Sequence, residues 1–117
     1  MLDTSPLTAA VERFADRLRA APQSRLQQGA AEAALELARE LSARAQALEG
    51  AAGAAGAPVR EMPDAGIFVV GDQVAVAGAD LAEALRGVPA PDSAKAPSEV
   101  LDEAVRLVEL AEARAMR

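Results

Sequence analysis

The side chains best suited to chemistry in this sequence are carboxylates spaced one helical turn apart near its C-terminus. Glu99 with Asp102, and Glu109 with Glu112, each have the i, i+3 spacing. On a helix, that spacing puts both carboxylates of a pair on one face. Hard cations such as Mg²⁺ and Mn²⁺ prefer oxygen ligands, so these four residues are the candidate metal ligands. The alternative is that they form ordinary solvated helix faces.

These acidic helices loosely resemble those of the all-α nucleotide pyrophosphatases, which are helical bundles that bind Mg²⁺ between helices bearing Glu and Asp. The resemblance covers only the acidic pairs and a run of Glu32, Glu36 and Glu40 at spacing four. It implies a Mg²⁺-dependent hydrolase that uses helix carboxylates. Those enzymes also surround the acids with basic, polar and aromatic nucleotide-binding groups, whereas here only Arg39 and Arg106 stand nearby. The hydrolase is therefore kept as an alternative.

Other kinds of catalysis lack their usual residues. The chain has no His and no Cys, so it offers no imidazole to activate a hydroxyl and no thiolate or imidazole metal site. Most Ser and Thr residues stand near predicted helix starts, where capping explains them. Gly50, Gly53 and Gly56 follow a predicted helix without a Lys-Ser or Lys-Thr, which indicates a linker and not a phosphate loop. We expect no catalytic residue and no cofactor, and the composition favours a non-enzymatic protein.

Four helical segments have to position these residues. Apolar residues at helical spacing predict helices over 6–20 and 24–49, the first ended by Pro22. In the second helix, apolar residues recur every eleven positions, which is typical of a long, straight bundle helix. A capping-box-like sequence predicts a short helix over 81–87, and the last helix is expected from about 97 to 117.

A change of period between these helices predicts β structure. Residues 67–70 and 73–77 are rich in Val and flank Gly71-Asp72, a typical two-residue hairpin turn. The Gly-, Ala- and Pro-rich stretch 50–65 is predicted to be a flexible linker inside a single domain that spans 1–117. The expected fold class is therefore α+β but mainly α, a bundle of about four helices with one two-stranded antiparallel β-hairpin.

The charge of the chain disfavours nucleic acid as a partner. The net charge is −6, and an acidic body repels phosphate backbones. A winged-helix-like DNA-binding regulator is still an alternative, with the hairpin as its wing and Arg13, Arg17 and Arg19 as phosphate contacts. No secretory signal or membrane span is recognisable, so we expect a cytoplasmic protein that does not associate with membranes.

A surplus of apolar surface predicts protein contacts. Much of the hydrophobic content is Ala, which buries little area, yet several large apolar residues fall outside the core stripes. The predicted contact residues are Leu35, Phe68, Val70 and Leu107. We expect a homodimer, with a second protein as the other candidate partner. The expected function is a small non-enzymatic interaction module, such as an adaptor, a chaperone-like binder or a regulatory subunit.

Overall fold

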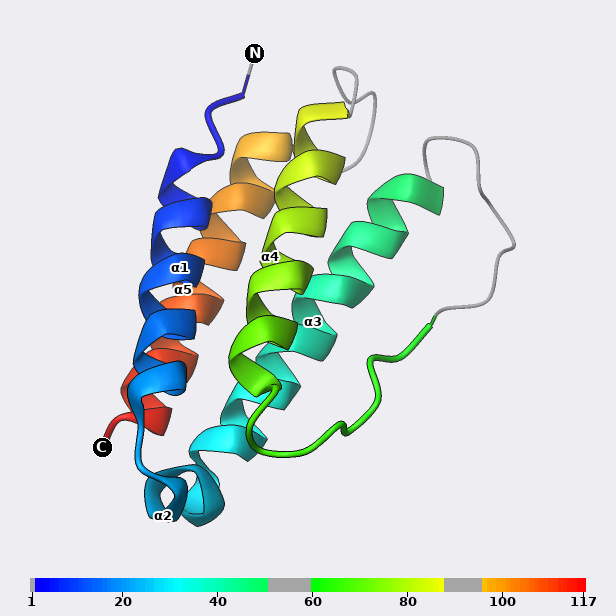
Figure 1. Cartoon of the computed structure of the whole chain (residues 1–117). Helices are drawn as coiled ribbons and strands as arrows, with labels where there is room; N and C mark the ends of the chain where they lie inside the picture. The colour runs from blue at the N-terminus through cyan, green and yellow to red at the C-terminus, as the bar shows by residue number, and fades with distance from the viewer. Residues whose placement is uncertain (1, 51–59, 88–95) are drawn as a thin grey trace.

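Four long helices form the bulk of the structure (Figure 1). The computed structural model describes residues 2–50, 60–87 and 96–117. The long helices are α1 (Ser5–Ala20), α3 (Ala31–Glu49), α4 (Val70–Gly87) and α5 (Pro97–Ala115). The short helix α2 (Gln23–Arg25) and the π-helical turn η1 (Leu26–Ala30) join α1 to α3 at one end of the bundle.

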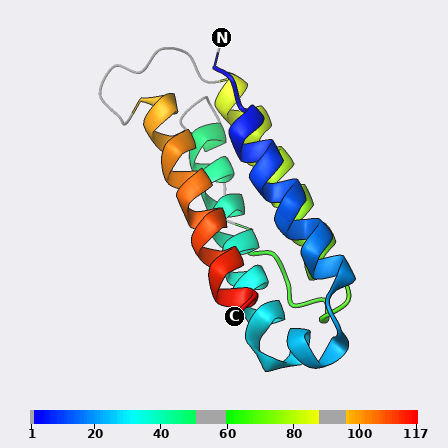
Figure 2. The same ribbon diagram turned by 90° about the vertical axis from the view of Figure 1, so that its left-hand side faces the viewer.

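Each long helix packs against two others. Helix α4 contacts α1 and α3, and α5 contacts the same two helices. Figure 2 shows α1 in front of α4 and α5 in front of α3. Helices α3 and α4 point in the same direction although they follow one another in the chain. Residues 60–66 run back along the bundle to the start of α4, so the fold is a four-helix bundle with one long crossover (Figure 1).

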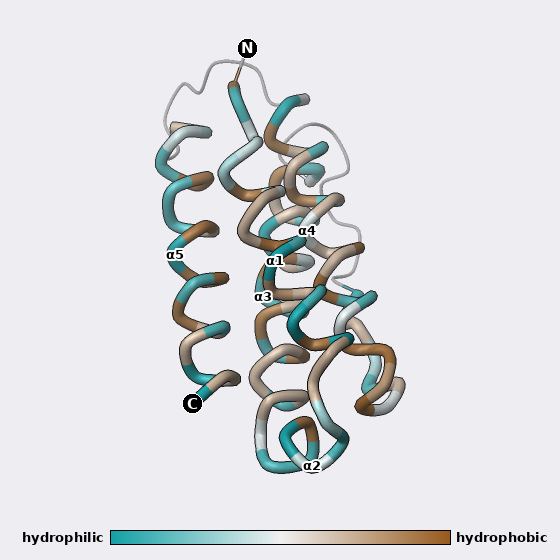
Figure 3. Tube along the Cα trace, turned by 60° about the vertical axis from the view of Figure 1, so that its left-hand side comes forward, coloured by the Kyte–Doolittle hydropathy of each residue, from teal (hydrophilic) through white to brown (hydrophobic). Residues whose placement is uncertain are grey.

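The predicted first and last helices are confirmed. Helix α1 begins one residue before the expected start and ends just before Pro22, and α5 covers most of 97–117. The largest fully buried side chains come from all four helices and fill the centre of the bundle. On α5, most of the hydrophobic segments face the other helices (Figure 3). These fully buried side chains are Leu7, Phe14, Leu18, Leu41, Val74, Leu81, Leu85 and Val108.

The prediction of one straight helix over 24–49 is wrong in its first quarter. The chain is interrupted at Gly29, whose φ of 127° lies in the region that favours glycine. Leu26 precedes this kink and is still buried. The eleven-residue spacing of apolar residues therefore continues through the kink, although the helix is not straight there. The kink separates the short turns that leave α1 from α3 proper.

The predicted β-hairpin over 67–77 is also wrong, because residues 70–87 form the continuous 18-residue helix α4. The part of the chain that the structure describes contains no strand. Val70, Val74, Ala77, Leu81 and Leu85 recur at helical spacing and are all buried, so packing on the bundle overrides the local β preference. The predicted helix over 81–87 is the second half of α4, and its expected capping box lies inside the helix.

Gly71, expected to turn the hairpin, instead sits at a close approach of α4 to α1. A Cβ added there would lie 3.2 Å from the carbonyl oxygen of Ala15. Near the start of α4, the glycine with a positive φ is Gly66, at 100°. Its N–H is bonded to the side chain of Asp64 at 3.0 Å.

The end of the crossover, residues 60–66, is held against the bundle by side chains. We call this segment the strap. The side-chain amide of Gln46 bonds both the N–H and the carbonyl of Arg60, each at 2.7 Å. Arg39 donates to the carbonyl of Met62 at 2.8 Å, and Gln73 donates to that of Pro63 at 2.8 Å. Within the predicted linker 50–65, residues 51–59 lie outside the described part of the chain.

Replacing Gln46 with alanine should loosen the strap selectively. The variant loses both bonds to the Arg60 backbone, and one such bond contributes about 1 kcal/mol. We therefore expect the Arg60 amide to exchange with solvent about five-fold faster, measured by NMR hydrogen exchange. Gln27→Ala, at an exposed glutamine of η1, is the matched control. If the exchange rate of the Arg60 amide is unchanged in Gln46→Ala, then Gln46 does not hold the strap.

Candidate protein-binding groove

A groove of about 490 Å³ runs between α3 and α5. We call it the α3/α5 groove. Its apolar lining and its charged rim come from both helices, which are neighbours in the bundle. The apolar lining residues are Ala33, Leu37, Leu107, Leu110 and Ala111. The charged residues beside them are Glu36, Arg39, Glu40 and Arg114.

The two leucines of α5 make this groove unusual for an alanine-rich bundle. Leu101, Ala104 and Val108 of α5 are buried in the core, Leu107 packs against its edge, and Leu110 is not part of it. Leu107 is half-buried, and Leu110 is 56% exposed. A large apolar side chain that is left exposed beside an apolar groove, as Leu110 is, is typical of a contact surface.

The predicted contact residues fall in different places. Leu107 lines the α3/α5 groove, whereas Leu35 lines a separate hollow beside the strap and Phe68 is 73% exposed just before α4. Val70 is only 3% exposed, because it belongs to a helix and not to an exposed strand face. The structure therefore does not present Val70 as a contact residue. Sequence analysis missed Leu110, although its i+3 spacing from Leu107 was a usable signal.

Ion pairs between α3 and α5 frame the groove. Arg44 of α3 contacts Glu40 on its own helix and Glu103 of α5, the latter at 3.2 Å. Burial disfavours the charged form of Arg44, but its hydrogen bonds to Glu40 and Glu103 outweigh this and raise its pKa above the ordinary value. At the other end of the groove, Arg114 of α5 pairs with Glu36 of α3 at 3.6 Å.

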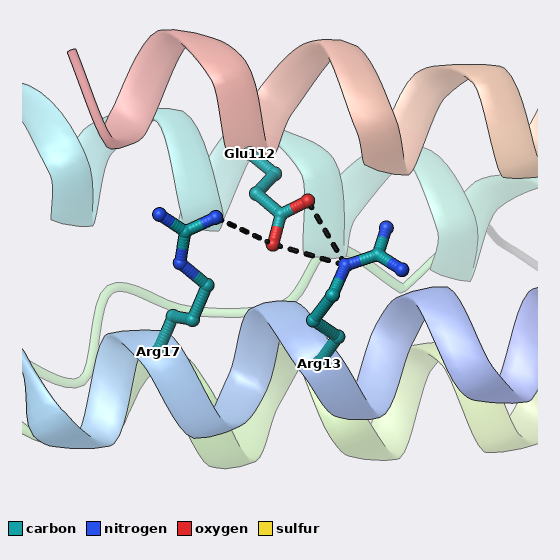
Figure 4. A network of polar contacts seen from close by, with 3 residues as sticks. All are labelled: Arg13, Arg17 and Glu112. Carbon is teal, nitrogen blue, oxygen red and sulfur yellow. Dashed lines mark hydrogen bonds and ion pairs between the residues drawn. The ribbon is translucent and has the colours of Figure 1, made fainter.

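The candidate metal ligands are not gathered into one site. Glu112 points between α5 and α1, where Arg13 and Arg17 hold it (Figure 4). Glu99, Asp102 and Glu109 are exposed on α5. Among the residues that the structure describes, no three acidic side chains come together as a metal site would require.

The arginines considered for DNA contact are engaged with carboxylates. Arg13 and Arg17 bind Glu112 at 3.3 and 3.2 Å, and Arg19 binds Asp72 of α4 at 2.6 Å. The hydrogen bond to Asp72 raises the pKa of Arg19. The wing of the DNA-binding alternative is absent too, because residues 70–77 belong to α4.

A second hollow, of about 480 Å³, lies beside the kink at Gly29. Arg25, Arg114 and Arg117 line it together with Glu32. Arg25 donates to the backbone oxygen of Arg117 at 2.9 Å, and Arg114 is paired with Glu36. Apart from Pro22, the apolar residues that line this hollow are alanines, so it offers no large apolar side chain to a protein partner and we do not treat it as the functional site.

The fold and the groove together define a class of protein: an alanine-rich four-helix bundle with one long crossover and an apolar groove on one side. Comparisons with protein-family models, with curated proteins and with solved structures give no match for the chain. Among the described helices, none is both long and apolar enough to cross a membrane.

Proposed function

We propose that this protein is a small non-enzymatic interaction module that binds an amphipathic helix of a protein partner in the α3/α5 groove. The observation that carries the proposal is the pair Leu107 and Leu110, which lines an apolar groove with one leucine half-buried at the edge of the core and the other 56% exposed. Two neighbouring helices with a groove between them offer a third helix the same packing that they offer each other.

The energetics favour such a partner. Full burial of a leucine side chain contributes about 1.5–3 kcal/mol, and Leu110 is still more than half exposed. The charged residues at the rim would stay in contact with water around a docked helix and would select its charge pattern.

The absence of Cys fits a reducing compartment, so we place the module in the cytoplasm.

Photo-crosslinking in cells that naturally make the protein tests this function. We expect a benzoylphenylalanine placed at position 110 to form an adduct with a protein, because Leu110 borders the groove. The same group at position 76 is the matched control, since Val76 is 54% exposed but lies on α4.

The adduct at position 110 should disappear when Leu107→Arg is added, because a charge in the groove opposes docking of an apolar face. If position 110 gives no protein adduct, or gives the same adducts as position 76, the proposed function is wrong.

A further inference from the structure

We propose that the helix bound in the α3/α5 groove is α5 of a second copy of this chain, docked antiparallel to the first. The inference rests on the proposed function and names its partner. It follows from the order of charges along one face of α5.

That face carries a stripe whose two ends have opposite charge. Glu103, Leu107, Leu110 and Arg114 follow at i, i+4, i+7 and i+11, so they lie in line along one side of the helix. Leu110 is 56% exposed, and the side chains of Glu103 and Arg114 are 37% and 60% exposed. The stripe is therefore acidic at one end, apolar in the middle and basic at the other end.

Such a stripe is complementary to itself only in the antiparallel orientation. When Leu107 lies opposite Leu110 of the partner subunit, Glu103 lies opposite Arg114 of the partner subunit. A two-fold axis repeats both contacts, as an isologous interface requires. A parallel orientation would place the two Glu103 side chains together and the two Arg114 side chains together, which is unfavourable.

The existing ion pairs fit this arrangement. Glu103 already contacts Arg44, and Arg114 already contacts Glu36. Docking would join one pair from each chain into a row of four side chains of alternating charge, in which Glu103 lies between two guanidinium groups and the partner's Arg114 lies between two carboxylates. A wholly acidic or wholly basic helix would instead meet a like charge at one end of the groove, so charge favours a second copy over such partners.

The molar mass of the full chain in solution tests the proposal. Sedimentation equilibrium at about 0.15 M salt, which screens most of the repulsion between the two negative copies, should give twice the 12.0 kDa of one chain. Leu110→Arg should give the mass of a single chain at the same concentration. Val76→Arg, at the matched exposed position on α4, should remain dimeric.

Charge reversal tests the orientation. E103R alone and R114E alone should each weaken the dimer about tenfold, because two ion pairs of a few tenths to 1 kcal/mol become repulsive contacts. The double variant E103R/R114E should bind more tightly than either single variant, since it restores opposite charges across the interface, although Arg44 and Glu36 of the same chain then face like charges. Thermal melts followed by circular dichroism check that every variant is folded.

Three results would overturn the inference: a single-chain mass for the unaltered protein up to about 100 μM, a dimer that survives Leu110→Arg, or a folded double variant that stays as weak as the single ones. A single-chain mass combined with a crosslink from position 110 to a different protein would overturn this inference and leave the proposed function intact. A single-chain mass with no crosslink at all would remove both.

Discussion

Gly78→Ala should destabilise the bundle by about 1–2 kcal/mol, although alanine is the better helix former. A Cβ at position 78 would lie 2.6 and 2.7 Å from the two methyl carbons of Val11 and 3.1 Å from its Cβ. Rotating the valine cannot clear all three contacts, so α1 and α4 would have to move apart. The overpacking cost of about 1–3 kcal/mol then exceeds the roughly 1 kcal/mol gained in helix propensity. Urea denaturation followed by circular dichroism measures the difference.

Two further variants make this test specific. Gly87→Ala is the control, since a Cβ at position 87 meets nothing within 4 Å, and it should leave stability unchanged or raise it. Val11→Ala introduced into the Gly78→Ala background should cost less than in the unaltered protein, with a coupling energy of about 0.5–3 kcal/mol. If Gly78→Ala raises stability as the control does, the close contact between α1 and α4 is disproved.

The same glycines explain where sequence reasoning failed. A glycine next to an aspartate, between runs of Val, is the usual signal of a hairpin turn, and Gly71-Asp72 carries it. In the folded chain, Gly71 and Gly78 are buried on α4, and both lie against α1. Whether a glycine turns the chain or admits a neighbouring helix depends on tertiary contacts that a local pattern does not contain. The apolar spacing from Val70 to Leu85 was the better signal, because it covers the whole helix.

Helices that depend on local signals were predicted well. Helix α1 has a proline in its first turn and another just beyond its end, and α5 likewise begins at a proline. The kink at Gly29 was missed because the eleven-residue spacing continues through it. A pattern of apolar residues reports which side of the chain is buried, but it does not report where the helix axis bends.

At the candidate site, too, the features that depend on one helix could be predicted, and those that depend on contacts between helices could not. Leu107 could be found because it widens the apolar stripe of its own helix, and that is a local property. The α3/α5 groove could not be found, because it depends on which helices become neighbours. Glu112 was a reasonable metal ligand by its spacing from Glu109. Its actual partners, Arg13 and Arg17, are more than 90 residues away in the sequence, so no local sequence pattern indicates that they contact Glu112.

Removing both arginines that hold Glu112 should be the most damaging change on the α1–α5 side of the bundle. Glu112 is 8% exposed, and its carboxylate accepts hydrogen bonds from Arg13 at 3.3 and 3.4 Å and from Arg17 at 3.2 Å. The double variant R13Q/R17Q leaves this buried charge without either guanidinium, for which losses of about 3–5 kcal/mol are typical. Both arginine side chains are 52% exposed, so water can reach the site and we expect a loss near the lower end, about 3 kcal/mol.

The effect should depend on which partner is removed. E112M alone should cost much less than R13Q/R17Q, because the two half-exposed arginines can turn their charged groups to water while the carboxylate cannot. Adding E112M to R13Q/R17Q should recover most of the lost stability, since it removes the stranded charge and keeps an unbranched side chain in its place. R106Q, at an exposed arginine of α5, measures the effect of losing one positive charge at the surface, and R13Q/R17Q should cost far more than twice that effect. Urea denaturation of the five proteins, the unaltered chain included, decides the matter. Equal losses for E112M and R13Q/R17Q would mean that lost hydrogen bonds, and not a buried unpaired charge, account for the effect.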